Sequence, residues 1–226
     1  MACFNNITIG IDIDDTIFTC VSTMLDYINE RIGTNIKMED LHSYWLEDYV
    51  PLPFKWIVEN GFHDKAFWKA IRPIERAGEA IVKLRRKGFN IYFVTASLPE
   101  NLRKKMNFLG RYLTMCERPA CFEEWGETVA EEDYFHWDEE YMRNHTINIR
   151  NKKLLKLDFL IDDNINNLRN ADYYGICLKY PWNAPHIPDG SVTFVENWEE
   201  VMITIQAILE MNYGYEPYDL YDIALY

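Results

Sequence analysis

The chain has 226 residues, of which 48% are hydrophobic, enough for one sizeable domain with a small insertion. Its formal net charge of −13, from 36 acidic and 23 basic residues, argues against a nucleic-acid polymer as partner, because such binding depends on phosphate neutralisation. No apolar run approaches the roughly 20 residues that span a bilayer, and the start MACFNNITIG lacks the basic and apolar regions of a secretory signal. We therefore expect a cytoplasmic protein that binds no membrane.

The five cysteines are odd in number and scattered along the chain, so a disulfide framework is not expected. Cys116 and Cys121 are spaced like half of a zinc site, but no second pair of cysteines or histidines with ligand spacing accompanies them. We interpret all five as reduced thiols, which are the rule in the cytosol.

The stretch 7–16, ITIGIDIDDT, has the composition of a strand buried on both faces, followed by three carboxylates within four positions. Asp12 and Asp14 are two residues apart, so both side chains can lean to the same side of the strand end. Two anions so close require a cation or a shared proton. The alternative is that Asp14, Asp15 and Thr16 only cap the following helix.

A helical region is expected after this strand. Apolar residues in 18–32 lie on one helical face, and Gly33 can end that helix. Residues 38–68 form short helical pieces broken by prolines and a glycine, and they are rich in aromatic residues. Such aromatics either form the core of a small helical bundle or line a pocket, since aromatic faces stack on a nucleobase. They are Trp45, Phe54, Trp56, Phe67 and Trp68.

Alternation of helices and strands then predicts an α/β fold with a parallel sheet. Expected helices are 75–86, 99–113, 165–173 and 198–211, and expected strands are 89–94, 147–149, 157–161 and 176–179. Between 117 and 145 stand ten acidic residues against two basic ones, with aromatic residues interleaved. We interpret this segment as an insertion with a solvated acidic face, and residues 212–226 as an acidic, tyrosine-rich tail.

Polar residues at the strand ends define the expected site. The carboxyl ends of parallel strands meet at one edge of a sheet, where such folds bind ligands. Hydroxyls and backbone N–H groups after the 89–94 strand make an anion site, unless Ser97 only caps the next helix. The hard carboxylate oxygens suit Mg²⁺. The residues expected to meet are Asp12, Asp14, Thr16, Thr95, Ser97, Lys152, Asp162 and Asp163.

The motif order DxDxT, strand-final Thr, Lys and Asp-Asp resembles the haloacid dehalogenase (HAD) superfamily of phosphatases. The chain is most similar to the 5′(3′)-deoxyribonucleotidase family, through the spacing from Arg150-Asn151-Lys152 to Asp162-Asp163 and a helical region directly after the first motif. The resemblance implies a HAD-like Rossmannoid fold of three α/β/α layers with a parallel sheet. It implies a core of residues 1–19 and 75–211, with a small helical cap, residues 20–74, inserted after the first strand.

The resemblance also implies residue roles. Asp12 would attack phosphorus and form an aspartyl-phosphate, while Asp14 would act as general acid and then base. The resemblance implies Thr95, Ser97, Lys152 and Arg150 as phosphate ligands. It places Mg²⁺ on Asp12, the main-chain carbonyl of Asp14 and Asp163, with Asp162 beside them. In the cap it places Tyr44, Trp45, Phe67 and Trp68 over the base of a nucleotide.

Several points stay open at this stage. Asp15 stands where many relatives of the family have glycine, and Lys104 or Lys105 could replace Lys152 as the phosphate-binding lysine. The expected substrate is a nucleoside monophosphate, with a sugar phosphate or another small metabolite as the alternative. A non-catalytic phosphate-binding or interaction module is the hypothesis from a different class, and a homodimer is left open.

Overall fold

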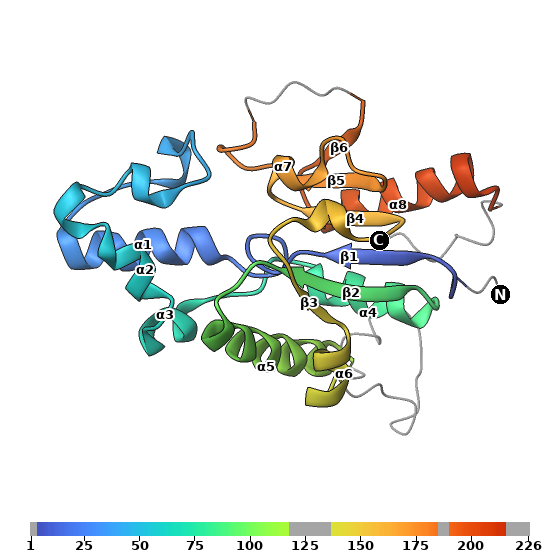
Figure 1. Ribbon diagram of the computed structural model, residues 1–226, viewed down its shortest axis with the longest axis horizontal. Coiled ribbons are helices and arrows are strands. Elements are labelled where there is room, and N and C mark those ends of the chain that lie inside the picture. Colours follow the sequence, from blue (N-terminus) through green and yellow to red (C-terminus); the bar gives the residue numbers. More distant parts are fainter. Residues whose placement is uncertain (1–3, 118–136, 185–189, 216–226) are drawn as a thin grey trace.

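The computed structural model describes residues 4–117, 137–184 and 190–215, and in these residues one parallel sheet forms the centre of the molecule. The strand order is β3-β2-β1-β4-β5-β6 (Figure 1). All neighbouring strands are parallel, as the alternation of helices and strands predicted. The strands are β1 (Thr8–Ile11), β2 (Asn90–Thr95), β3 (Thr146–Asn148), β4 (Phe159–Asp162), β5 (Tyr174–Leu178) and β6 (Val192–Val195).

The two faces of the sheet carry different layers. Side chains alternate along each strand, so Phe93 and Ile161 belong to the large core on one face, while Val94 and Leu160 belong to a smaller core on the other. Contacts among helices α4, α5 and α8 build the layer over the large core. Helix α7 packs on β4 and β5. Helix bounds are α4 (Ala77–Arg86), α5 (Pro99–Cys116), α6 (Glu139–Asn144), α7 (Ile165–Leu168) and α8 (Trp198–Tyr213).

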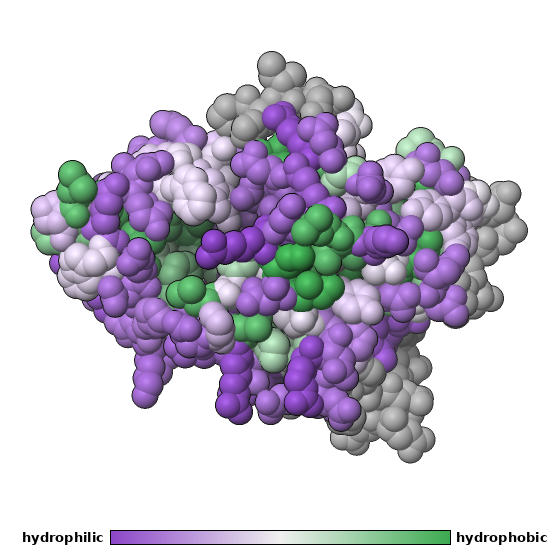
Figure 2. Space-filling model, viewed as in Figure 1, coloured by the Kyte–Doolittle hydropathy of each residue, from purple (hydrophilic) through white to green (hydrophobic). Residues whose placement is uncertain are grey.

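The cover over the smaller core is thin. Besides α7 it includes the connection from β3 to β4, which contains the 3₁₀ turn η7 (Lys152–Leu154) and the partly buried Leu155 and Leu157. Figure 2 shows apolar side chains gathered over the middle of the sheet in this view. Nothing in the described part of the chain forms a helix long and apolar enough to cross a membrane.

A helical unit stands beyond the carboxyl ends of the strands (Figure 1). It contains α1 (Cys20–Ile32), α2 (Trp56–Gly61), α3 (Lys65–Ala70) and the 3₁₀ turns η1 (Met38–Asp40), η2 (Leu46–Asp48) and η3 (Leu52–Phe54). Helix α1 ends at Gly33, whose φ of 69° suits a residue without Cβ. The segments that leave and re-enter the core pair at its base, where the Thr19 N–H donates to the Arg72 carbonyl at 2.9 Å. This helical unit is called the cap below.

Two elements differ from the sequence-based expectation. A helix was predicted over 165–173, but α7 ends at Leu168 because Arg169 is extended and Asn170 adopts a φ of 54°. Strand β6 was not predicted, although its residues alternate in the manner of a strand. Most of the acidic insertion, 118–136, and most of the tail, 216–226, lie outside the described residues.

Candidate active site

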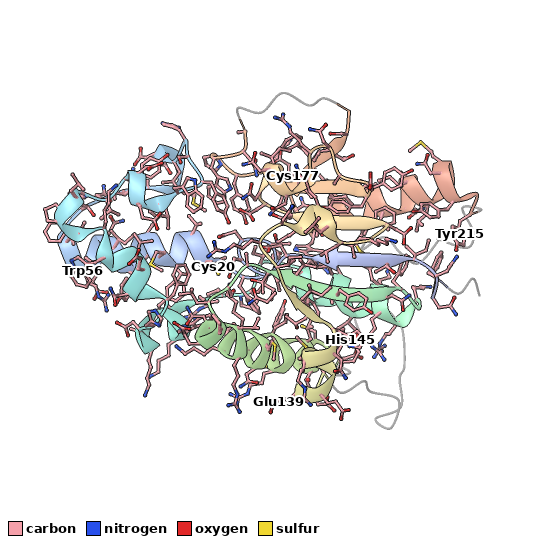
Figure 3. All side chains as sticks on the ribbon, viewed as in Figure 1. Cys20, Trp56, Glu139, His145, Cys177 and Tyr215 are labelled. Atoms are coloured by element: carbon pink, nitrogen blue, oxygen red, sulfur yellow. The ribbon has the colours of Figure 1, made fainter. Side chains whose placement is uncertain are left out.

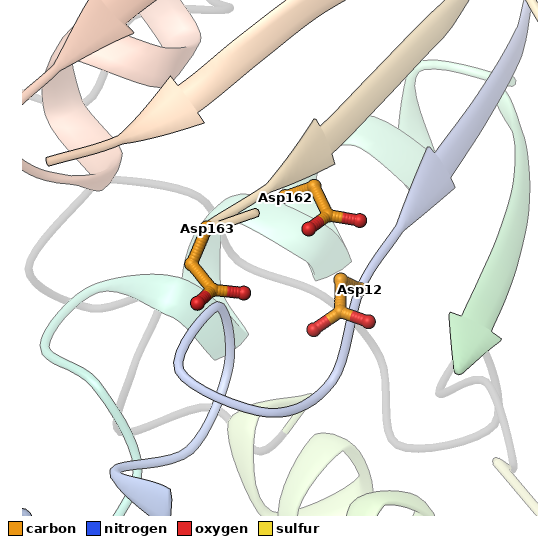
Figure 4. A group of neighbouring side chains, drawn as sticks. All are labelled: Asp12, Asp162 and Asp163. Carbon is orange, nitrogen blue, oxygen red and sulfur yellow. The ribbon is translucent and has the colours of Figure 1, made fainter. Parts of the chain in front are cut away.

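Three buried carboxylates form the centre of the site. Asp12 follows β1, Asp162 ends β4, and Asp163 comes next; their side chains converge in Figure 4. The register that pairs Ile11 with Ile161 brings the two strand ends side by side. One oxygen from each of the three carboxylates lies within 4.8 Å of the others, close enough to share one metal ion.

Lys152 supplies positive charge inside this cluster. Its buried Nζ contacts Asp12 and lies 2.7 Å from Asp162 Oδ2. One ammonium cannot neutralise three carboxylates. Burial first, then the nearby Asp162 and Asp14 carboxylates, raise the pKa of Asp12 to about 7 even though Lys152 lowers it. The hard oxygen ligands and the uncompensated negative charge fit a divalent cation.

Asp162 and Asp163 differ in how many of their oxygens are already engaged. Asp162 accepts hydrogen bonds from Lys152, from the Asn164 N–H at 2.8 Å and from Asn167 Nδ2 at 3.0 Å. Asp163 accepts through Oδ2 from Trp182 Nε1 at 3.1 Å. The second oxygen of Asp163 is therefore better suited to bind a cation.

The turn after β5 holds Asp163 in place. Besides the Trp182 contact, Asn183 Nδ2 donates to the Asp163 carbonyl at 2.8 Å and to the Leu178 carbonyl at 2.7 Å. The Trp182 ring stacks on Tyr180, with centroids 4.4 Å apart. The sequence indicated only a turn at 181–183. Its position after a strand was the one available signal of a role in the site.

Asp14 lies on the cap side of the carboxylates and is paired with a second buried lysine. Cys20 Sγ donates to its Oδ1 at 3.0 Å, and Lys105 Nζ contacts its Oδ2. Burial alone would raise the pKa of Asp14, but Lys105 and Cys20 together lower it below its usual value. Lys105 and Lys152 both reach the site. The adjacent Lys104 is exposed and lies over the Trp68 ring.

Hydroxyl groups meet at the end of β2. Thr95 is fully buried, and its Oγ1 lies 2.9 Å from Ser97 Oγ. Asn148, at the end of β3, fixes the Ser97 backbone by accepting from its N–H and donating to its carbonyl, both at 2.9 Å. Sequence reasoning missed Asn148, although its strand-end position was a usable signal. The side chain of Arg150 is exposed.

Asp15 and Thr16 serve the loop rather than the carboxylate centre. Asp15 has a φ of 53°, a conformation in which glycine is favoured, and its carboxylate accepts from the Val21 N–H at 2.9 Å near the start of α1. Capping, the alternative considered for the whole cluster, is therefore the role of Asp15. The buried Thr16 carbonyl accepts from Trp198 Nε1 at 2.8 Å, which ties the loop to α8.

The four cap aromatics occupy two different environments. Tyr44 and Trp45 are 41% and 62% exposed. Desolvation of the Tyr44 hydroxyl and the nearby carboxylates of Asp163 and Asp12 raise the pKa of this phenol, so Tyr44 lies close to the site. Phe67 has no exposed surface, and Trp68 donates from Nε1 to the Phe62 carbonyl at 2.7 Å. Phe67 thus packs in the cap core, which corrects its expected place in the substrate pocket.

The model of the family described as 5′ nucleotidase, deoxy (pyrimidine), cytosolic type C protein matches residues 5–129 and 123–209. A putative 5′(3′)-deoxyribonucleotidase of Staphylococcus aureus (strain Mu50) is 23% identical over 197 residues, covering 86% of this chain and 92% of that protein. The 5′(3′)-deoxyribonucleotidase of Bacillus subtilis (strain 168) is 22% identical over 199 residues, covering 85% and 95%.

A HAD family hydrolase from Deinococcus radiodurans R1, solved with bound phosphate and sodium, has the same fold, with a TM-score of 0.50 and 14% identity over 92% of this chain and 97% of that one. The sheet order, the strand-end carboxylates and the extent of the family match agree with one another. The chain belongs to the cytosolic type C 5′ nucleotidase family of HAD phosphatases and is a phosphoric monoester hydrolase.

Proposed function

We propose that the chain is a Mg²⁺-dependent 5′(3′)-(deoxy)nucleotidase that dephosphorylates nucleoside monophosphates through an aspartyl-phosphate on Asp12. The observation that carries the proposal is the buried Asp12, held by Lys152 beside Asp162 and Asp163. The names of the Staphylococcus and Bacillus relatives support the substrate class. The word cytosolic in the family description supports a cytoplasmic location, and the free thiols of Cys20 and Cys177 agree with it.

In the proposed reaction, an Asp12 oxygen forms a bond to phosphorus while the bond from phosphorus to the sugar oxygen breaks. The leaving oxygen takes a proton from Asp14, whose pKa is lowered in the free protein by Lys105 and Cys20 and would be raised by the negative charge of a bound phosphate. Water then attacks the phosphoryl group, Asp14 accepts its proton, and the bond to Asp12 breaks to release phosphate. Thr95, Ser97 and Lys152 would hold the phosphoryl oxygens, with Arg150 turning inward from its exposed position.

Mg²⁺ would be held by Asp12, the main-chain carbonyl of Asp14 and Asp163. Asp162 would stay beside the ion, because its oxygens are already bonded to Lys152, Asn164 and Asn167. When bound, the ion supplies positive charge that neutralises the phosphoryl oxygens.

Trp182→Phe should weaken binding of Mg²⁺ by roughly 10-fold, because it removes the N–H that orients Asp163 but keeps an aromatic ring beside Tyr180. Calorimetric titration of metal-free protein with MgCl₂ measures this directly. Trp56→Phe is the matched control, since Trp56 is exposed at the outer end of the cap (Figure 3) and should leave the affinity unchanged. Equal affinities for the Trp182 variant and the wild type would refute the assignment of Asp163 as direct ligand.

The cap should select the substrate. Tyr44 lies near the carboxylates of the site, and the exposed Trp45 ring packs edge to face against it with centroids 5.5 Å apart. Such surface suits stacking on a base. Trp68 is half-buried and would contribute only through its exposed edge. A sugar phosphate has no base that could stack on this aromatic surface.

The proposal is tested by measuring phosphate release from deoxynucleotides, ribonucleotides and sugar phosphates. We expect nucleoside monophosphates to be hydrolysed fastest with MgCl₂ present, and turnover to stop with EDTA and return when Mg²⁺ is restored. If sugar phosphates are hydrolysed and nucleotides are not, the proposed substrate class is wrong, while the proposed reaction on phosphomonoesters stands. Inactivity on every phosphomonoester would reject the enzyme in favour of a phosphate-binding module.

A further inference from the structure

Lys105 lies inside the site although it comes from a helix rather than a strand end. It is the seventh residue of α5 and only 6% exposed. Its Nζ contacts Asp14 Oδ2 and lies 3.4 Å from Thr95 Oγ1. A buried ammonium requires such partners, so the position of Lys105 and that of the Asp14 carboxylate are linked.

The Asp14 carboxylate is held from two sides. Lys105 approaches one oxygen from the core, and Cys20 Sγ donates to the other at 3.0 Å from the first residue of α1, at the base of the cap (Figure 3). Asp14 itself lies in a loop, and its side chain is 31% exposed. Without these contacts it would sample several rotamers. Each carboxylate oxygen has a second acceptor position, so the contacts leave room for a proton to be exchanged.

We propose that Lys105 is a positioning residue, which holds the Asp14 carboxylate where it can exchange a proton with the leaving-group oxygen. Lys152 then serves the other half of the site, where it contacts Asp12 and Asp162. This inference rests on the proposed function of Asp14. Lys105 then acts on the leaving group through Asp14, and Lys152 acts on the attacking group, Asp12. If Lys105 were instead a second phosphate ligand, it would act only on the phosphoryl oxygens.

The division predicts dependence on the leaving group. When the bond from phosphorus to the ester oxygen breaks, a nucleoside alkoxide needs the proton that Asp14 supplies. A p-nitrophenolate is stable as the anion and leaves without it. The value of kcat/KM reports only the steps through this first bond cleavage, so the later attack of water on the phosphoenzyme does not enter the comparison.

The test compares Lys105→Met with Arg111→Met, which removes the same charge from an exposed position farther along the same helix. For Lys105→Met we expect kcat/KM to fall on the order of 100-fold for a deoxynucleoside monophosphate and less than about threefold for p-nitrophenyl phosphate. Arg111→Met should stay within about twofold of the wild type on both substrates. Equal losses on both substrates with Lys105→Met would overturn the proposal and make Lys105 a phosphate ligand.

A crystal structure of Lys105→Met gives a readout that needs no activity. The Asp14 carboxylate should leave the position that it has in the wild type, and an unchanged Asp14 would contradict the proposal. If Lys105→Met does not fold, Lys105→Arg keeps the buried charge while displacing it, and the same selective loss is expected. If the wild type prefers another alkyl phosphate, that ester replaces the nucleotide in the ratio; inactivity on all esters rejects the proposed function, and the structures still decide the role of Lys105.

Discussion

Asp12→Asn should abolish turnover, with kcat falling on the order of 10⁴-fold or more, because a carboxamide is not a nucleophile toward phosphorus. The substitution is nearly isosteric, and the amide oxygen can still accept from Lys152. Removal of one buried carboxylate, whose pKa is already raised to about 7, also relieves repulsion within the cluster. The protein should therefore fold normally. Phosphate release and the thermal unfolding midpoint measure the two effects.

Asp15→Asn is the matched control for this variant. Asp15 is equally buried, but its carboxylate accepts from backbone N–H groups at the start of α1, those of Cys20 and Val21, and asparagine tolerates its φ of 53°. Turnover of this variant should stay within about threefold of the wild type, as for a substitution outside the reacting groups. A comparable loss in both variants would mean that charge, rather than nucleophilic attack, explains the effect at Asp12. Substantial turnover by Asp12→Asn would remove Asp12 from its proposed role.

The sequence predicted the strand-end part of the site because topology determines it. Once β1 and β4 are parallel neighbours, Asp12 and Asp162 must lie side by side, whatever the details of packing. The same rule placed Thr95 and, had it been applied to β3, would have placed Asn148 as well. The fold class follows from the hydrophobic periods of the sequence, and these site residues follow from their positions at the ends of strands.

Other contacts depend on packing between elements that are far apart in the sequence. Lys104 and Lys105 look alike in the sequence, and only the rotation of α5 buries the second and exposes the first. Phe67 and Trp45 are both cap aromatics, yet packing against Tyr27 and Phe62 buries only Phe67. Such distinctions arise from tertiary structure, so a local pattern could not predict them.

Lys152→Met should destabilise the fold by about 3–5 kcal/mol in the absence of metal at pH 8, because it leaves buried carboxylates without the ammonium that contacts Asp12 and Asp162. Urea unfolding measures the free energy. Mg²⁺ should return part of this stability, since an ion that binds only the folded state stabilises it and meets a larger excess of negative charge in the variant. Lys153→Met is the control, because Lys153 is exposed and its loss should change the free energy of unfolding by less than about 0.5 kcal/mol.

The pH dependence of the Lys152→Met defect identifies its cause. In the folded wild type the pKa of Asp12 is raised from 3.8 to about 7, and loss of Lys152 raises it further, so the folded state binds protons that the unfolded state has released. Below pH 4 the carboxyl group is protonated in both states and costs no stability. As pH rises from 3.8 to 7, the unfolded state releases this proton while the folded state still holds it, so the wild type loses stability; in the variant this window extends to higher pH. The difference in unfolding free energy between Lys152→Met and the wild type should therefore be smaller at pH 5 than at pH 8. A difference that is the same at both pH values would mean that lost packing of the lysine stem, rather than unpaired carboxylates, destabilises the variant.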